Sequence, residues 1–188
     1  MNDQIKQSIE RSADTIRGLA AQAPAIARIG EVIVSALRAG GKVLTAGNGG
    51  SAAEALHMSE ELVGRFLSNR RSLPAVALVA DPTALTCIGN DFGFDEIFRR
   101  QVQGLGRPGD VLVLFSTSGK GENLQRALAE ARARGLTTIS LLGRNGGPMA
   151  GKSDYELIVP GQETARIQEA HQVVMHILLE IVERAFAE

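Results

Sequence analysis

The chain has 188 residues, with 20 Lys and Arg against 21 Asp and Glu, so its formal net charge is −1. This balance argues against a nucleic-acid binder, because neutralising phosphates requires clustered basic side chains. The longest uninterrupted apolar run, Ala75 to Ala80, is far shorter than the roughly 20 residues that span a membrane. The N-terminus is too polar for a signal peptide, and the single cysteine, Cys87, is expected to be a small buried residue. We therefore predict one domain over residues 1–188, in the cytoplasm, without nucleic-acid or membrane partners.

The first forty residues are predicted to form two helices. Apolar residues recur at helical spacing from Ile5 to Leu19 and again from Ile26 to Leu37, where two glycines follow. Both helices precede the rest of the fold and have broad apolar faces. We expect this pair, residues 1–40, to pack at least partly against another subunit.

Short, continuous apolar runs alternate with helix-like segments in the remainder of the chain. Continuous runs are typical of strands that are covered on both faces. The five expected strands are Lys42–Thr45, Ala75–Ala80, Val111–Phe115, Thr138–Leu142 and Tyr155–Val159. Helices are expected over residues 51–66, 82–103 and 123–134, briefly near Gly147, and from about 163 to 186. This alternation predicts an α/β three-layer sandwich with a five-stranded parallel sheet.

Two strand-to-helix junctions carry small polar residues. The first contains Asn48, Gly49, Gly50 and Ser51, and the second contains Ser116, Thr117, Ser118 and Gly119. Glycine allows close approach of a ligand to the backbone, and the following helix N-terminus presents unpaired amides that attract phosphate. Such junctions lie at the carboxyl edge of a parallel sheet, where ligands bind. Both are candidate phosphate loops; the alternative is an ordinary turn in which serine caps the helix.

Ionisable residues gather on two of the predicted helices. His57 and Glu61 are four residues apart and share a helix face, a spacing that suits two ligands of one metal or an acid/base pair. On the last helix, Gln168 and His176 can line one side, and His176 lies among apolar residues where an imidazole needs a partner. The alternatives are a surface pair for His57 and Glu61, a hydrogen-bonded core histidine for His176, and polar surface for Gln168.

Four segments together resemble the phosphoheptose isomerases, a branch of the sugar isomerase (SIS) domain family. They are AGNGGSAAEALHMSEELVGRF, CIGNDFGF, STSGKGENL and ARIQEAHQVVMHILLEIVE, in the family's order over nearly the whole chain. The resemblance implies a flavodoxin-like sandwich, a homotetramer with sites between subunits, and one Zn²⁺ per subunit. It also implies a sugar-phosphate substrate: sedoheptulose 7-phosphate would be interconverted with a D-glycero-D-manno-heptose 7-phosphate, which feeds bacterial surface-heptose synthesis.

The resemblance assigns roles to individual residues. Its zinc ligands fall on His57, Glu61, Gln168 and His176. Its substrate contacts fall on Asn48, Gly49, Gly50, Asn90, Asp91, Ser116, Thr117 and Ser118, with Glu61 and Gln168 also touching the sugar. The family's second loop reads STSGNS, whereas this chain has Lys120 and Gly121 after the shared STSG, so one hydroxyl donor to phosphate is missing. Either Lys120 or Ser51 compensates, or phosphate binds more weakly. No contact is assigned to Ala165, where some relatives have an acidic residue.

An aldose–ketose isomerisation moves a proton between C1 and C2 through an enediol, which needs a base, an acid and stabilisation of the oxyanion. We predict that Glu61 and His176 are the acid/base pair, that zinc polarises the carbonyl, and that Asp91 orients sugar hydroxyls. One alternative is a non-catalytic SIS regulator that binds the replication initiator protein. Another is an isomerase of a different sugar phosphate, such as arabinose 5-phosphate. The presence of His57, Glu61 and His176 together favours the heptose enzyme.

Overall fold

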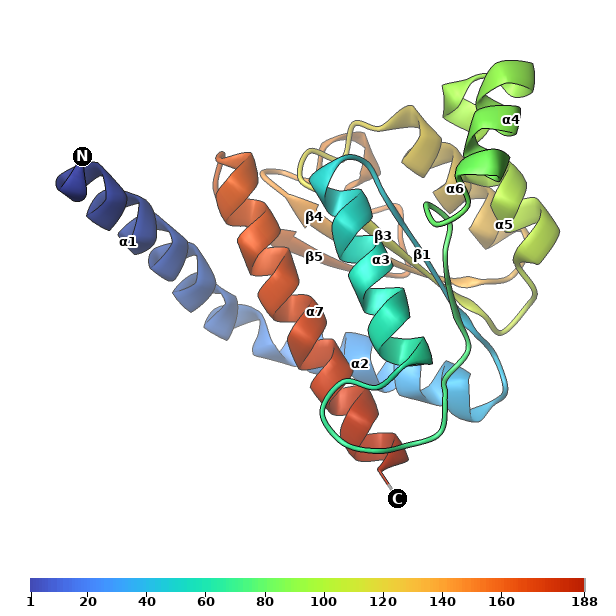
Figure 1. Ribbon diagram of the computed structural model, residues 1–188, viewed down its shortest axis with the longest axis horizontal. Coiled ribbons are helices and arrows are strands. Elements are labelled where there is room, and N and C mark those ends of the chain that lie inside the picture. The colour runs from blue at the N-terminus through green and yellow to red at the C-terminus, as the bar shows by residue number, and fades with distance from the viewer. Residues whose placement is uncertain (188) are drawn as a thin grey trace.

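Figure 1 shows the computed structural model of the chain, which describes residues 1–187. The elements in chain order are α1 (Asn2–Gly18), the 3₁₀ turn η1 (Leu19–Gln22), α2 (Ala23–Arg38), β1 (Val43–Gly47), α3 (Gly50–Val63), β2 (Ala75–Ala77), α4 (Pro82–Phe92), η2 (Phe94–Glu96), α5 (Arg99–Leu105), β3 (Val111–Ser116), α6 (Glu122–Ala133), β4 (Thr137–Gly143), η3 (Gly147–Met149), β5 (Tyr155–Val159) and α7 (Thr164–Phe186).

The strands form one parallel sheet in the order β2-β1-β3-β4-β5. The predicted five-stranded parallel sheet is therefore confirmed. The register pairs Val43 with Val111 and Gly47 with Phe115, so β1 and β3 end side by side. The strand order reverses between β1 and β3, and the chain leaves these two strands in opposite directions around the sheet. Such a switch point opens a crevice at the carboxyl edge of the sheet, where ligands bind in this class of fold.

Both faces of the sheet are covered. On β3, Val111, Val113 and Phe115 point into one core, with α2, α3 and α7, whereas Leu112 and Leu114 point into a second core, with α5 and α6. All five side chains are fully buried. Each such burial stabilises the fold by about 1.5–3 kcal/mol, which explains why the strands read as continuous apolar runs instead of alternating ones.

The two N-terminal helices differ in how many of their side chains are buried. The apolar face of α2, including Ile26, Ile29, Ile33 and Leu37, is buried in the core beside α7. By contrast, none of the residues Asn2–Gly18 is buried, and α1 extends away from the body of the molecule (Figure 1). Packing of this helical pair against another subunit stays a prediction.

One helical stretch, Asn2–Arg38, is long and apolar enough by length and composition to cross a membrane. Its most apolar window has a mean hydropathy of 1.2, and 33% of that window is buried in the fold. A core helix of a soluble protein passes the same test, and α2 supplies buried side chains to the core here. The stretch by itself is therefore a weak indication of a membrane segment.

The segment between β2 and β3 corrects three predictions. The single helix expected over 82–103 is interrupted at Gly93, whose φ of 90° is accessible mainly to glycine, and it divides into α4, η2 and α5. The second strand is shorter than expected, because only Ala75–Ala77 pair with β1. Cys87 is exposed, since none of the residues of α4 is buried. Its local sequence is apolar, but the helix that carries it stands outside the core.

A buried ion pair ties the loop after α3 to the end of α7. Glu183 accepts hydrogen bonds from Arg70 Nε at 2.8 Å, from the Ser68 amide at 2.7 Å and from the Leu67 amide at 3.2 Å. Arg70 also donates to the main-chain carbonyls of Leu62 and Glu61. The side chains of Arg70 and Glu183 are only 1% and 6% exposed. This pair therefore fixes the C-terminal end of α3 relative to α7.

Replacing Glu183→Gln should lower the free energy of unfolding by about 3–5 kcal/mol, because Arg70 would keep a buried charge without its partner. Urea denaturation at pH 7 measures this loss. The matched control is Glu180→Gln, three residues earlier on α7, whose ion pair with Arg184 is exposed and should contribute less than about 1 kcal/mol. Equal effects of the two substitutions would contradict this account of the Arg70–Glu183 pair.

The same pair should contribute a pH dependence. Burial alone would raise the pKa of Glu183, but hydrogen bonds from Ser68, Arg70 and Leu67 together lower it below its ordinary value of 4.5. A lowered pKa in the folded state stabilises the protein above the unfolded pKa, and this stability disappears as pH falls through the folded pKa. The difference in unfolding free energy between the wild type and Glu183→Gln should therefore be full at pH 7 and shrink below about pH 4.5.

The loop after β3 fits closely against the turn after β4. Gly119 has a φ of 62°, and a Cβ built on it would overlap the carbonyl oxygen of Gly146. Ser116 Oγ accepts a hydrogen bond from the Gly119 amide at 3.0 Å, which closes the loop on itself. Glycine is therefore required at position 119 for both conformation and space.

Gly119→Ala should destabilise the protein by more than about 1–2 kcal/mol, the cost of a left-handed backbone alone, because the added methyl group also meets main chain. The control is Gly104→Ala in α5, where no described atom lies within 4 Å of the added Cβ. That change should stabilise the helix by about 0.5–1 kcal/mol. Urea midpoints compare the two variants, and similar midpoints would refute the close packing at Gly119.

Candidate active site

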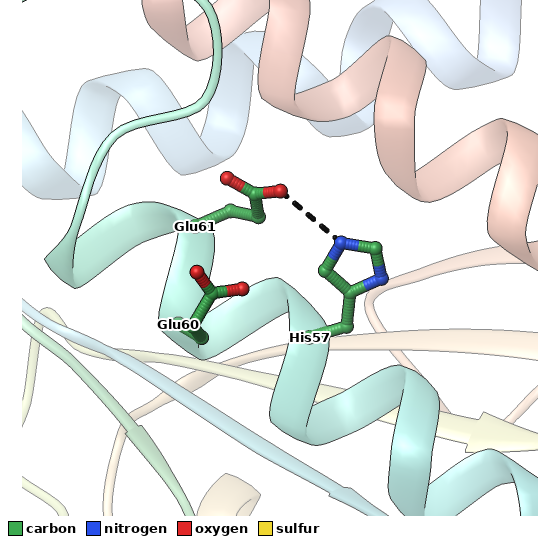
Figure 2. Close-up of side chains that lie close together, drawn as sticks. All are labelled: His57, Glu60 and Glu61. Carbon is green, nitrogen blue, oxygen red and sulfur yellow. Dashed lines mark hydrogen bonds and ion pairs between the residues drawn. The ribbon is translucent and has the colours of Figure 1, made fainter.

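His57 and Glu61 lie on the same face of α3 and contact one another. His57 Nε2 is 3.1 Å from Glu61 Oε1, and Figure 2 shows the ring and the carboxylate pointing toward each other. The Glu61 side chain is 16% exposed and that of His57 is 35% exposed, so the pair is partly shielded from solvent. This burial distinguishes it from a surface ion pair.

The last helix brings His176 to this pair. The rings of His57 and His176 meet edge to face, with centroids 5.3 Å apart, and His176 stacks on Phe66 at 5.5 Å. Gln172 lies between the two imidazoles, with Nε2 at 2.6 Å from His57 Nδ1 and at 3.4 Å from His176 Nε2. The polar partner expected for His176 is therefore Gln172 of its own helix, and α3 adds a ring contact through His57.

The two helices meet because both pack on the same face of the sheet (Figure 1). Buried apolar residues of α3, including Ala55, Met58 and Leu62, belong to the same core as buried residues of α7 such as Val174 and Leu178. Each helix then presents its polar residues along the edge of this apolar contact. Side chains more than a hundred positions apart in the chain are thereby brought into contact.

Gln168 lies one helical turn before Gln172, against the first loop. A Cβ on Gly50 would overlap the Gln168 amide, so the side chain is packed directly over the start of α3. Gly50, His57, Gln168 and Gln172 line one groove of about 520 Å³, together with Glu54. The groove runs along α3 from the glycine loop to the histidine.

A reciprocal pair of amides joins the first glycine loop to the start of α6, just after the second loop. Asn48 Nδ2 donates to Asn123 Oδ1, and Asn123 Nδ2 donates to Asn48 Oδ1, both at 2.9 Å. A Cβ on Gly121 would lie 2.9 Å from Asn48 Nδ2, so this pair occupies the space that a side chain at position 121 would need. In the second loop Ser116 is buried, and Thr117 and Ser118 are half-buried. In the first loop Gly49 has a φ of 59° and Ser51 is buried.

Asn90 and Asp91 stand apart from this cluster. Both are exposed on α4, where Asn90 Nδ2 donates to Asp91 Oδ1 at 2.8 Å and Cys87 Sγ lies 3.7 Å from Asp91 Oδ2. Figure 1 shows α4 at the upper right of the molecule, away from α7, with α3 between them in this view. Within one chain, the structure does not bring these two residues to the histidines.

The donor atoms at His57 and Glu61 fit a metal ion. His57, Glu60 and Glu61 each offer a ligand atom, and these atoms lie within 4.8 Å of one another (Figure 2). Imidazole nitrogen and carboxylate oxygen are typical zinc ligands. His176 provides a further imidazole beside this group. Glu60, which is exposed, was not predicted from the sequence.

Several polar residues of the site carry no clear signal in the sequence. Gln172 sits one turn before His176, and Asn123 follows the second loop, but neither contact can be inferred without the neighbouring helix. Glu54 and His171 form a buried pair, with His171 Nδ1 at 3.8 Å from Glu54 Oε2. Within residues 1–187, neither carboxylate oxygen of Glu54 has a hydrogen-bond partner. For Glu54, the sequence offered only its position three residues before His57, which places both side chains near one face of the same helix.

Known proteins share this fold, and several share much of the sequence. A family model described as the SIS domain matches residues 7–143. The phosphoheptose isomerase of Rhodospirillum rubrum is 48% identical over 185 residues, which cover 98% of both chains. That of Aquifex aeolicus is 47% identical and covers 100% of this chain and 99% of the relative.

Solved structures agree with these sequence relatives. The phosphoheptose isomerase from Francisella tularensis superposes with a TM-score of 0.93 at 38% identity, covering 97% of each chain. The phosphoheptose isomerase from Neisseria gonorrhoeae superposes with a TM-score of 0.91 at 38% identity, covering 97% of this chain and 98% of that one. With nearly the whole chain matched in both sequence and fold, this protein belongs to the phosphoheptose isomerases, a family of SIS-domain proteins.

Proposed function

We propose that the protein interconverts D-sedoheptulose 7-phosphate and D-glycero-D-manno-heptose 7-phosphate by proton transfer through an enediol, and that the product supplies surface-heptose synthesis. The observation that carries this proposal is that His57 contacts both Glu61 and the ring of His176, on a helix that begins at the first glycine loop. Relatives that are 46–48% identical over nearly the full length are phosphoheptose isomerases, which supports the same reaction here.

The length of α3 suits a long sugar phosphate. Gly50 lies in the first loop and His57 seven residues later, which corresponds to about 10 Å along the helix axis. An extended seven-carbon sugar phosphate can span this distance, with its phosphate at the loops and its carbonyl end at the histidines. The proposed phosphate contacts are the loops Asn48–Ser51 and Ser116–Ser118, where backbone amides and hydroxyls are the available donors. Ser51 is buried behind the first loop, whereas Lys120 is exposed beside the second.

Glu61 and His176 are the proposed acid and base. One of the two would take the proton from one carbon over one face of the sugar and return it to the neighbouring carbon, while the other would protonate the carbonyl oxygen and accept the proton of the adjacent hydroxyl. His57 contacts Glu61 Oε1 and would hold the carboxylate in place, while Arg70 anchors the Glu61 main chain. Gln168, packed over Gly50, is placed to contact sugar hydroxyls.

Zinc is the proposed cofactor, held by His57, Glu61, Gln168 and His176. The neighbouring imidazole of His57 and carboxylate of Glu61 support two of these four ligands, and Glu60 is a further candidate ligand. When bound, Zn²⁺ would supply Lewis-acid polarisation of the substrate carbonyl. A carboxylate that also binds metal is a weaker base, so Glu61 would have to release the metal during turnover or leave more of the proton transfer to His176.

The proposed assembly is a cytoplasmic homotetramer with sites between subunits. Two surfaces support contacts between copies of the chain. The helix α1 leaves Ile5 and Ile9 exposed, and Phe92 and Phe94 are exposed around the end of α4. Asp91, which is remote from the histidines of its own chain, would then orient sugar hydroxyls in the site of a neighbouring subunit.

Glu61→Gln should abolish turnover of sedoheptulose 7-phosphate, because the amide cannot accept the proton; general acid–base groups typically contribute 10²–10⁴-fold. A coupled assay of heptose phosphate formation measures the rate, and circular dichroism checks the fold. Glu180→Gln on the exposed side of α7 is the control and should keep wild-type turnover. Near-normal activity of Glu61→Gln would remove this residue from the mechanism.

Removal of metal should abolish the isomerase activity, and added Zn²⁺ should restore it. Metal content measured by mass spectrometry before and after chelation should follow the activity, with one Zn²⁺ per subunit in the active form. Full activity of a metal-free preparation would contradict the zinc proposal. Parallel assays with arabinose 5-phosphate distinguish the heptose enzyme from an isomerase of a shorter sugar phosphate.

A further inference from the structure

Gln172 is the side chain that contacts both histidines of the site. It lies on α7 one turn before His176 and faces α3. Its Nε2 is 2.6 Å from His57 Nδ1 and 3.4 Å from His176 Nε2. Gln172 is among neither the zinc ligands nor the substrate contacts proposed above, and its contacts need an explanation of their own.

The contacts of His57 determine where its proton lies. A carboxylate can only accept hydrogen bonds, so the 3.1 Å contact with Glu61 Oε1 requires the proton of a neutral His57 ring on Nε2. His57 Nδ1 then carries a lone pair and accepts from the amide NH₂ of Gln172. The same amide nitrogen lies 3.4 Å from His176 Nε2, so its second N–H can donate to that nitrogen when it carries a lone pair. The network is consistent only when Gln172 presents its nitrogen to both rings.

We propose that Gln172 is a positioning residue, whose amide orients both imidazoles and, in the metal-free protein, keeps the His57 proton on the nitrogen that faces Glu61. The inference rests on the proposed function of the His57, Glu61 and His176 cluster. An imidazole held at one nitrogen can still rotate about its bond to Cβ. A contact at the opposite nitrogen removes this freedom, so Glu61 and Gln172 together fix the ring of His57.

A glutamine also suits the zinc-bound state. If an ion takes the place of the proton on His57 Nε2, the neutral ring carries its proton on Nδ1 and becomes a donor there. The carboxamide of Gln172 can turn by half a rotation and accept that hydrogen bond through Oε1. Partners of this kind behind a metal ligand set its orientation and raise its basicity. An amide can therefore hydrogen-bond to His57 Nδ1 in both the metal-free and the zinc-bound state, whereas a hydrocarbon side chain can do so in neither.

The decisive variant is Gln172→Met, which keeps the length and flexibility of the side chain but lacks the amide. Zinc affinity, measured by competition with a chromophoric chelator, should fall roughly 10- to 100-fold, as for other losses of such partners. Gln172→Glu should recover most of this loss, because its carboxylate accepts from Nδ1–H. If Gln172 only filled space, the charge added in Gln172→Glu would not restore zinc affinity.

A second readout needs no metal. Long-range ¹H–¹⁵N correlation spectra of histidine-labelled, metal-free protein report which ring nitrogen carries the proton. The wild type should show His57 protonated at Nε2, and Gln172→Met should show a mixture of both tautomers. His171 is an internal reference, because its Nε2 donates to the Leu142 carbonyl at 3.0 Å and does not depend on Gln172.

The control is Gln103→Met on α5, which removes a hydrogen bond to Glu130 Oε2 away from the histidines. It should change neither zinc affinity nor the His57 tautomer.

If Gln172→Met does not fold, Gln172→Asn tests the same contacts, because it keeps the amide but cannot reach both rings. Wild-type zinc affinity and an unchanged His57 tautomer in the folded variant would overturn the inference. Absence of isomerase activity in the wild type would instead refute the proposed function, and the tautomer would still decide the role of Gln172.

Discussion

The packing of α3 against α7 is the contact on which the site depends. Met58 and Leu62 of α3 and Val174 and Leu178 of α7 belong to one buried core on the same face of the sheet. Protein interiors are packed as tightly as organic crystals, so this contact holds the two helices at a nearly constant separation. The polar side chains along the edge of this contact are therefore also held at a nearly constant separation. Functional groups carried by packed helices are held more accurately than groups on loops, which is what proton transfer between fixed positions requires.

The phosphate end of the site follows from the topology of the sheet. β1 and β3 are neighbours whose following segments diverge, so both glycine loops open at one edge. The reciprocal amides of Asn48 and Asn123 join the first loop to the start of α6, and Gly121 leaves the space in which they meet. The same helix α3 then begins at one loop and carries His57 two turns later. One rigid element thus sets the distance between the proposed anion site and the ionisable cluster.

Buried polar groups surround the contact between α3 and α7, so few substitutions are expected to be tolerated there. Arg70 connects Glu183 of α7 to the main chain at Glu61, so the ion pair that holds a surface loop also holds the end of α3. Glu54 and His171 are buried between the same two helices, although Glu54 lacks hydrogen-bond partners among residues 1–187. Buried polar groups without protein partners are rare in native proteins, and a bound water, a bound ion or a catalytic role can account for them. Their position beneath the groove agrees with a ligand-binding role for this face.

Local patterns in the sequence were sufficient for the parallel sheet, the two glycine loops and the pairing of His57 with Glu61, because each depends on periodicity or on residues within one helical turn. The interruption of the helix at Gly93, the exposure of Cys87 and the short second strand were not foreseen, since they depend on which elements reach the core. Gln172 illustrates the limit most clearly. Its spacing from His176 could be read from the chain. Its contact with His57, 115 residues away in sequence, exists only because tertiary packing brings α3 and α7 to one face of the sheet.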